Sequence, residues 1–183
     1  MQDTIQGLQS IRIDAKSSTI CLKTDTGLFF TVVEKEITGG MDRVYRVYHR
    51  MHNSKSKTIR KILHFWLRTV YSCDIMPRTV IGRGTRFAHN GLGVVINQDA
   101  VIGENCVVGK GVVIGGRSGI SRVPHIGNMV EIGANSVVIG PIDIGDFAQI
   151  GAGSVVLHDV EPYTIVAGNP AKPIKRIVPE DMK

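Results

Sequence analysis

The chain has 183 residues, a formal net charge of +6 and a hydrophobic fraction of 43%, with 5% aromatic residues. This length fits one main domain with a small appendage, and no apolar run approaches the roughly 18 residues that a membrane span requires. The cysteines are widely spaced and form no CxxC pair, which argues against a disulfide framework or a zinc site: they are Cys21, Cys73 and Cys106. The N-terminus also lacks the apolar segment of a secretory signal, so we expect a cytoplasmic protein.

Residues 1–40 are predicted to be distinct from the rest of the chain. Two short runs rich in apolar residues, Ile20–Leu22 and Leu28–Val33, flank an Asp-Thr-Gly turn, and this arrangement is a hairpin signal. The sequence leaves two alternatives open. One is a small β appendage, and the other is a loosely attached extension upstream of a native start at Met41.

Residues 41–72 carry the excess of positive charge and are predicted to form two helices that break near Asn53. The segment holds eight Lys and Arg residues against a single acid, Asp42. The second helix, predicted over Lys57–Ser72, has an apolar side and a basic side. The apolar side comprises Ile59, Ile62, Leu63, Trp66 and Val70, and the basic side comprises Arg60, Lys61, His64 and Arg68. We expect the helices to cap the domain that follows. The same basic amphipathic surface fits contact with the inner face of an anionic membrane. No nucleic-acid recognition motif accompanies the charge, so no nucleic-acid partner is predicted.

An aliphatic residue recurs every six residues through most of residues 73–160. The clearest positions are Ile96, Ile102, Val108, Ile114, Ile126, Ile132, Val138, Ile144, Ile150 and Val156. A period of six is neither the 3.6 of a helix nor the 2 of a strand, and it is the signature of a parallel β-helix around a narrow aliphatic core. The predicted fold class is therefore all-β, a parallel β-helix of hexapeptide repeats with a short N-terminal helical cap. Residues 161–183 are expected to leave the coil as an extended tail.

Two breaks interrupt the repeat, and such breaks are places where function can be inserted. The first slips the register by three residues within the segment AHNGLG, residues 88–93. Its His89 stands beside glycine, and a histidine is suited to act as a general base near neutral pH. The second break, from Gly116 to His125, is glycine-rich and basic and is expected to protrude as a loop.

Asp74 is the predicted partner of His89. It lies fifteen residues earlier in the sequence, which is about one turn of a coil built from three hexads once the slip is counted. A carboxylate at that place would fix the tautomer of the ring and stabilise its protonated form. The alternative is a turn aspartate at the start of the coil.

Several segments together resemble the left-handed β-helix acyltransferases, and more closely their serine acetyltransferase branch. They are AHNGLGVVIN (88–97), PHIGNMVEIGANSVVIG (124–140), IGAGSVVL (150–157) and AGNPAKPI (167–174). The resemblance covers roughly residues 41–178. It implies a left-handed coil, transfer of an acetyl group from acetyl-CoA to a hydroxyl without a metal, and a homotrimer with active sites between neighbouring coils.

The resemblance also implies roles for individual residues. His89 matches the base that takes the proton of the acceptor hydroxyl, and Asp74 matches the residue that orients it. Backbone N–H groups near Gly115 and Gly116 are expected to stabilise the oxyanion. The remaining assignments are Ala134, Ala152 and Lys172 for CoA, and His125 and Asn90 for the acceptor. No acyl-enzyme is expected, because Cys106 occupies an inward position of the repeat.

Two departures from the serine acetyltransferase pattern indicate a different acceptor. Ala88 stands where that branch carries an aspartate, and Val123 stands where it carries a histidine after the arginine matched by Arg122. The PHIGN segment and the short cap resemble instead the O-acetyltransferases of bacterial exopolysaccharide clusters, so we expect a sugar hydroxyl in polysaccharide biosynthesis as the acceptor. The alternatives are a serine O-acetyltransferase of cysteine biosynthesis and a non-catalytic β-helix scaffold. A zinc-dependent hexapeptide protein is disfavoured, because His89 and His125 lack a clear third histidine.

Overall fold

The computed structural model describes residues 8–14, 19–24, 29–33 and 42–177. The chain divides into two compact units, one of residues 1–40 and one of residues 41–182. In the first unit, three antiparallel strands form a sheet in the order β1-β2-β3, with β1 at Leu8–Asp14, β2 at Thr19–Thr24 and β3 at Phe29–Val33. The strands β2 and β3 lie where the sequence predicts a hairpin, and its turn lies outside the described residues. The strand β1 was not predicted.

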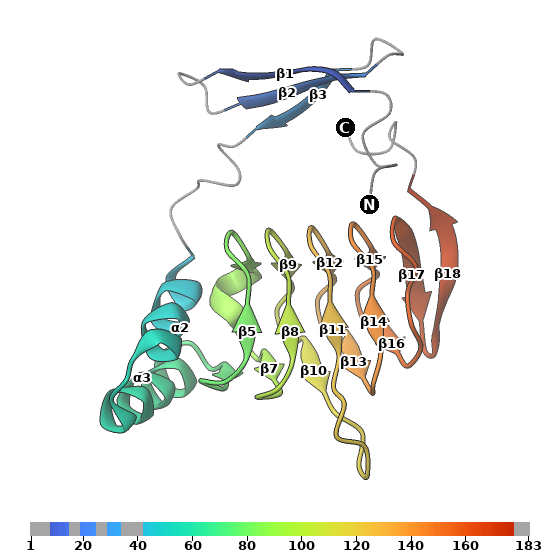
Figure 1. The fold of residues 1–183 in the computed structure, drawn as a ribbon. Helices are drawn as coiled ribbons and strands as arrows, with labels where there is room; N and C mark the ends of the chain where they lie inside the picture. Colours follow the sequence, from blue (N-terminus) through green and yellow to red (C-terminus); the bar gives the residue numbers. More distant parts are fainter. Residues whose placement is uncertain (1–7, 15–18, 25–28, 34–41, 178–183) are drawn as a thin grey trace. The chain divides into compact units, whose positions relative to one another are not determined.

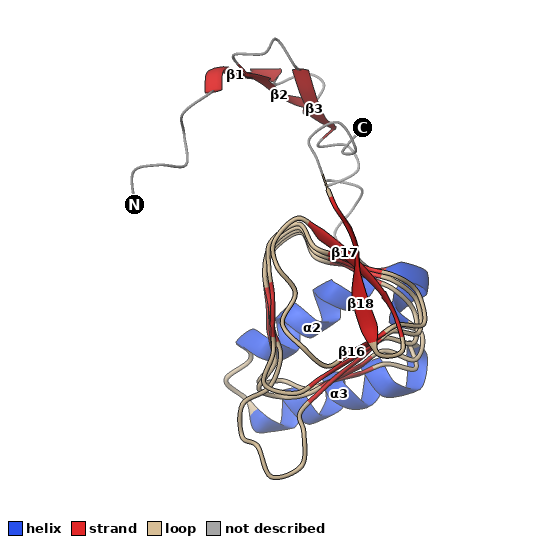
Figure 2. Ribbon diagram, turned by 90° about the vertical axis from the view of Figure 1, so that its right-hand side faces the viewer, coloured by secondary structure: helices blue, strands red, loops and turns tan. Residues whose placement is uncertain are grey.

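The second unit is a coil of three parallel sheets, to which each turn adds one strand per sheet (Figures 1 and 2). The first sheet contains β4 (Asp74–Ile75), β7 (Val95–Ile96), β10 (Val113–Gly115), β13 (Val137–Ile139) and β16 (Val155–Val156). The second contains β5 (Val80–Ile81), β8 (Val101–Ile102), β11 (His125–Ile126) and β14 (Asp143–Ile144). The third contains β6 (Arg86–Phe87), β9 (Val107–Val108), β12 (Glu131–Ile132), β15 (Gln149–Ile150) and β17 (Thr164–Gly168), with β18 (Ala171–Arg176) at its edge.

The repeating aliphatic residues form the core of this coil. In the first sheet, Ile75, Ile96 and Ile114 stand in register on successive turns, and each side chain is at most 1% exposed. The other two sheets contribute equivalent rows of buried Ile, Val and Phe. The view along the axis shows a triangular cross-section with sheets as sides and turns as corners (Figure 2). The predicted left-handed parallel β-helix of hexapeptide repeats is confirmed.

Both breaks in the repeat are absorbed at corners without loss of strand register. Asp74 pairs with Val95, 21 residues later, because the first break adds three residues to that turn. Val95 then pairs with Val113, 18 residues later, which is the regular turn. Val113 pairs with Val137, 24 residues later, because the second break adds a loop. That loop extends from the coil between β10 and β11 (Figure 1).

The helix α2, Arg43–Asn53, covers the N-terminal end of the coil (Figure 2). Its buried side chains, Val44, Tyr45, Tyr48 and Met51, join the core of the coil. The Tyr48 hydroxyl donates a hydrogen bond of 2.6 Å to the carbonyl oxygen of Thr79. A helical cap was therefore predicted correctly for this part of the chain.

The helix α3, Lys57–Val70, packs differently from the prediction. Its predicted core-facing side is largely exposed, and Leu67 is its one buried side chain. The reason is geometric, because the end of a narrow coil offers room for one helix and α2 occupies it. Figure 2 shows α3 along one edge of that end. No helix in the described part of the chain is long and apolar enough to cross a membrane.

The C-terminal segment differs from the expected extended tail. The strand β17 pairs in parallel with β15 and thus continues the third sheet of the coil. The strand β18 folds back antiparallel to β17, so that Ala167 is paired with Lys172. The coil is therefore closed at this end by a hairpin up to Ile177, whose side chain is 8% exposed.

Candidate active site

The first break forms a tight 3₁₀ turn, η1, over Ala88–Gly91 between β6 and β7. His89 has φ 54° and ψ 37°, and Asn90 has φ 56° and ψ 33°, so two consecutive residues with side chains are left-handed. This conformation costs about 1–3 kcal/mol for each such residue, and it persists only where the surroundings hold it. The His89 side chain is exposed at this turn, and no described residue forms a hydrogen bond with its ring. A strained turn thus presents a histidine to the outside of the coil.

Contacts from the helical cap hold this turn in place. Asp42 caps α2 by accepting a hydrogen bond of 2.8 Å from the Val44 N–H, and its second carboxylate oxygen accepts one of 2.5 Å from the Phe87 N–H. On the other side of the turn, the Gly93 N–H donates to the Ser72 carbonyl oxygen at 2.9 Å. These bonds fix the backbone on both sides of His89. Asp42 thus caps α2 and anchors the turn through Phe87. This role was not predicted from the sequence, although an Asp before a helix is a recognised capping signal.

Asp74 lies next to this turn but is bound to a different histidine. Its N–H donates to the Val94 carbonyl oxygen at 2.8 Å, which places the start of β4 beside the end of the turn. Its Oδ1 lies 2.8 Å from Nε2 of His64 on α3, and its Oδ2 lies 3.8 Å from Nη1 of Arg68. The expected contact between Asp74 and His89 is not among the contacts of the described residues. Sequence reasoning missed His64, because nothing in the pattern of α3 distinguishes it from a solvated residue.

The residues assigned to CoA lie on the same corner of the coil as His89. The turns between the third and first sheets stack on one another, and we call this stack the His89 corner. Along it, the Asn135 N–H donates to the Lys110 carbonyl oxygen and the Gly153 N–H donates to the Ala134 carbonyl oxygen, both at 2.8 Å. The fit is close, because a Cβ on Gly133 would come within 2.5 Å of the Ala152 nitrogen.

The same corner continues to the C-terminal hairpin. A Cβ on Gly151 would lie 2.8 Å from the Cβ of Ala167, and Ala167 is the strand partner of Lys172. His89, Asn90, Ala134, Ala152 and Lys172 therefore lie at successive levels of one edge of the coil, with Asp74 at the end where the coil begins. The assignment of these residues to one site stays a prediction.

The remaining predicted residues lie on another corner, between the first and second sheets. The strand β10 ends there at Gly115, and the loop of residues 116–124 begins with Gly116. Arg122 returns this loop to the coil: one of its guanidinium nitrogens donates to the Pro141 carbonyl oxygen at 3.1 Å, and another pairs with the Asp143 carboxylate. We call this stack of turns the Arg122 corner.

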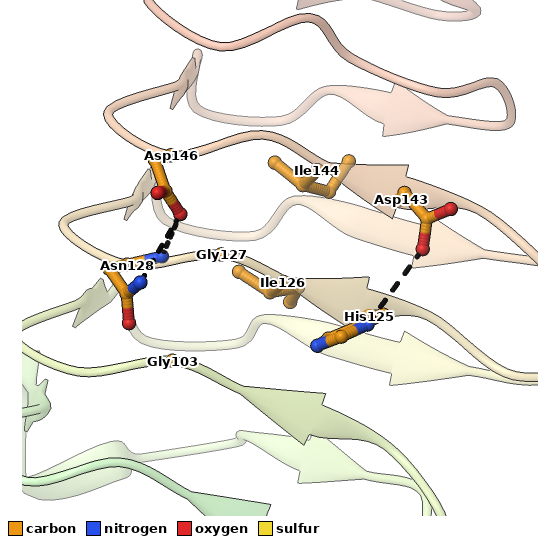
Figure 3. Close-up of a pocket in the computed structure, with 8 residues that line it drawn as sticks. All are labelled: Gly103, His125, Ile126, Gly127, Asn128, Asp143, Ile144 and Asp146. Atoms are coloured by element: carbon orange, nitrogen blue, oxygen red, sulfur yellow. Dashed lines mark hydrogen bonds and ion pairs between the residues drawn. The ribbon is translucent and has the colours of Figure 1, made fainter. Parts of the chain in front are cut away.

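His125 begins the strand beyond the Arg122 corner and lines an open depression of about 280 Å³ (Figure 3). Its Nδ1 lies 4.0 Å from Oδ1 of Asp143, and both side chains are more than half exposed. At the other end of the depression, Asp146 accepts a hydrogen bond of 2.6 Å from the Asn128 N–H. The carboxylates lining this depression therefore already have partners within the chain. Because His125, Gly115 and Gly116 are on a different corner from His89, one chain alone does not assemble all the predicted residues.

The cysteines of the coil are not suited to nucleophilic catalysis. Burial raises the pKa of the Cys73 thiol to about 12, and the nearby Asp74 and Asp42 add to this shift. Burial likewise raises the pKa of Cys106, whose Sγ lies 3.1 Å from the Gly127 carbonyl oxygen. A thiol that stays protonated is a poor nucleophile. Within the described ranges, no group of three or more His, Cys, Asp or Glu side chains is placed to hold a metal ion.

Comparison with known proteins identifies the repeat and its relatives. Residues 124–158 match the family model described as bacterial transferase hexapeptide (six repeats). The chain is a hexapeptide-repeat left-handed β-helix protein. Serine acetyltransferase 2 of Arabidopsis thaliana is 39% identical to it over 141 residues, which are 76% of this chain and 43% of that protein.

Solved structures agree with this relationship. A soybean serine acetyltransferase complexed with serine matches with a TM-score of 0.67 and 38% identity, covering 72% of this chain and 56% of the soybean chain. A serine acetyltransferase in complex with CoA matches with a TM-score of 0.65 and 32% identity, covering 72% of this chain and 55% of the other. This hexapeptide-repeat chain thus spans about half the length of the relatives it matches.

These findings correct the expected acceptor. The prediction of an exopolysaccharide O-acetyltransferase, which rested on Ala88, Val123 and the PHIGN segment, is wrong. The relatives are serine acetyltransferases, which was the stated alternative. Similarity over 141 residues carries more information about the acceptor than the two substituted positions, Ala88 and Val123.

Proposed function

We propose that this protein is an acetyl-CoA-dependent serine O-acetyltransferase. The observation that carries the proposal is the exposed His89, which a strained and doubly anchored turn presents on the corner shared with Ala134 and Ala152. The sequence relatives support serine as the acceptor, and structural neighbours were solved with serine and with CoA. Reaction type, acceptor and cofactor are consistent with one another in this proposal.

The proposed reaction is direct transfer between two bound substrates. The ring of His89 takes the proton of the serine hydroxyl as that oxygen attacks the thioester carbonyl of acetyl-CoA. The C–S bond then breaks, CoA leaves as a thiolate, and the protonated ring returns the proton to the sulfur. Backbone N–H groups are suited to stabilise the oxyanion formed on the carbonyl. The products are O-acetylserine and CoA, and no covalent enzyme intermediate is formed.

We propose that Asp74 is a positioning residue for this reaction. Its carboxylate is held by His64 and Arg68, and its backbone is bonded to the residue that follows the His89 turn. Asp74→Asn should lower kcat and shift its pH profile, whereas a purely structural role would change stability and leave the profile in place. His64→Gln, which keeps a hydrogen-bonding group beside Asp74, should have the smaller effect of the two.

We further propose that the complete site forms between copies of the chain, in a homotrimer. The outer face of the first sheet carries a row of valines between the two corners: Val95, Val113, Val137 and Val155. Val95 is 44% exposed and the others are partly exposed, although such residues gain by burial. A copy packed against this row would bring its Arg122 corner toward the His89 corner of its neighbour. Arg122 is then the candidate for the serine carboxylate, because a guanidinium binds carboxylates with two parallel hydrogen bonds.

The experiment is an assay of thiol release from acetyl-CoA with L-serine, L-homoserine and L-threonine. We expect release with L-serine, and a loss of about 10²–10⁴-fold in kcat for His89→Ala. The matched control is His49→Ala, an exposed histidine on α2, which should keep full activity. No L-serine-dependent release by a folded protein that binds CoA would overturn the acceptor. Full activity of His89→Ala would overturn the assignment of the base.

A further inference from the structure

The helix α3 exposes a continuous apolar face. Ile59, Ile62, Trp66 and Val70 follow one another at helical spacings of three and four, so they share one side of the helix. They are 48%, 60%, 50% and 54% exposed, and the neighbouring Phe65 is 67% exposed. Exposing adjoining large apolar side chains to water is unfavourable in free energy, and an exposed apolar patch of this kind marks an interaction site. We call these five residues the α3 face.

A row of positive charge runs beside the α3 face. Lys57, Lys61 and Arg68 recur at spacings of four and seven, which places them on one side of the helix next to the apolar residues. Lys55 precedes the helix and adds to this charge. The only acid of residues 42–72 is Asp42, whose two carboxylate oxygens accept the Val44 and Phe87 N–H groups. Arg68 lies 3.8 Å from the Asp74 carboxylate, which offsets part of its charge. Lys55, Lys57 and Lys61 have no acid on either helix beside them, so the surface around the α3 face is basic.

We propose that α3 docks the protein onto an anionic lipid bilayer, with the α3 face buried in the interface and the basic row against the lipid headgroups. An apolar face with Trp and Phe, flanked by Lys and Arg, matches the chemistry of such a surface. The helix has 14 residues and is therefore about 21 Å long, less than the roughly 30 Å of a bilayer core, so it lies in the plane of the interface.

The charge pattern favours a bilayer over a second copy of the chain. A two-fold contact places the same patch on itself, so the basic row of one copy would approach the basic row of the other. Like charges held that closely repel one another, whereas anionic headgroups attract each Lys or Arg near the surface by about 1 kcal/mol. The bilayer is therefore the occupant that satisfies both the apolar and the basic parts of α3.

Trp66 gives a direct test, because it is the only tryptophan of the chain. Its fluorescence is recorded on the full-length protein with vesicles of phosphatidylcholine alone and of phosphatidylcholine with phosphatidylglycerol. We expect a blue shift and co-sedimentation with the anionic vesicles only, both weakened by salt. An unchanged spectrum without co-sedimentation would overturn the proposal. So would an emission already blue-shifted and insensitive to vesicles, because another segment or copy would then cover the face.

Two variants separate the apolar and electrostatic contributions while keeping Trp66 as the reporter. Ile62→Ser with Phe65→Ser should lower vesicle binding by more than about 100-fold, since each side chain contributes about 1.5–3 kcal/mol when buried. Lys57→Glu with Lys61→Glu should lower it on the order of 25-fold or more, from about 1 kcal/mol for each lysine. The matched controls are Leu157→Ser and Arg83→Glu with Arg176→Glu, exposed positions on the coil that should leave binding unchanged. Equal loss in variants and controls would overturn the assignment to α3. The assignment would also be overturned if light scattering showed that Ile62→Ser with Phe65→Ser lowers the number of subunits in the protein.

Discussion

The two breaks in the repeat are built in opposite ways. The first, at residues 88–93, is short and strained, and hydrogen bonds at Phe87 and Gly93 hold it in place, with Gly91 buried. The second, at residues 116–124, is longer and largely exposed, and Arg122 binds it to the coil through surface contacts. The proposed base thus lies on the rigidly anchored break, and the proposed carboxylate-binding residue lies on the loosely anchored one. A regular coil can therefore supply both a fixed and an adaptable part of a site by interrupting the same repeat twice.

The largest predicted loss of stability comes from removing the anchor of the first break in the repeat. Asp42→Ala deletes the cap of α2 and leaves the buried Phe87 N–H without its partner. We expect a loss of about 2–4 kcal/mol in the free energy of unfolding, from the sum of a lost cap and an unsatisfied donor. Denaturant unfolding measures it. The control Asp99→Ala, which removes an exposed pair with Arg78, should change stability by less than about 1 kcal/mol.

The packing of α2 under the first break gives the next largest effect. Tyr48→Phe removes the buried hydroxyl that bonds to the Thr79 carbonyl oxygen, and it should cost about 1–3 kcal/mol at neutral pH. An equal stability of the variant and the wild type in chemical denaturation would contradict this expectation.

The same residue predicts how stability depends on pH. Burial raises the pKa of Tyr48 to about 12 from its usual value near 10. Above pH 10 the unfolded chain releases this proton while the folded chain keeps it, so folding stability falls as the pH rises from 10 to 12. Tyr48→Phe should make this decline shallower, and Cys73, whose pKa is also raised to about 12, accounts for part of what remains. Unfolding curves across this range of pH check the slope.

A matched pair of glycines compares the two breaks directly. Gly91 has φ +69° and is buried in the first break, and Gly119 has φ +80° in the loop, with nothing within 4 Å of an added Cβ. Gly91→Ala should cost about 1–2 kcal/mol, because the left-handed conformation is enforced there. Gly119→Ala should cost less than about 1 kcal/mol, because an exposed loop can readjust. Thermal unfolding of both variants measures the difference, and equal losses would show that the loop is as firmly held as the turn.

The anchor of the second break should matter least for stability and more for substrate binding. Arg122→Ala removes an exposed ion pair with Asp143 and should change the free energy of unfolding by less than about 1 kcal/mol. If Arg122 binds the serine carboxylate, KM for L-serine should rise about tenfold or more. The matched control is Arg117→Ala on the same loop, which should leave KM unchanged. A large loss of stability in Arg122→Ala would show that the second break is anchored as firmly as the first.

Much of the fold was predictable because the coil is held by local repetition. Each turn buries its own Ile and Val, so the position of Ile96 or Ile126 in the hexad is enough to predict that it faces the core. The packing of α3 was not predictable in this way. Its apolar residues have the same helical spacing as those of α2, and a spacing shows only that a helix has two sides. Which helix forms the cap depends on the size of the coil's end, and neither helix sequence gives information about that size.

For the candidate site, the coil, its two breaks and the position of His89 at the first break could all be predicted from the sequence. The tertiary structure is responsible for the other features. It placed Ala134, Ala152 and Lys172 on the corner of His89, because successive turns of the coil stack at fixed register. It also pairs the Asp74 carboxylate with the His64 ring and places His125 on a different corner from His89. The physical reason is that hexad periodicity is a local property, whereas side chains meet across turns, helices and neighbouring copies that lie far apart in the sequence.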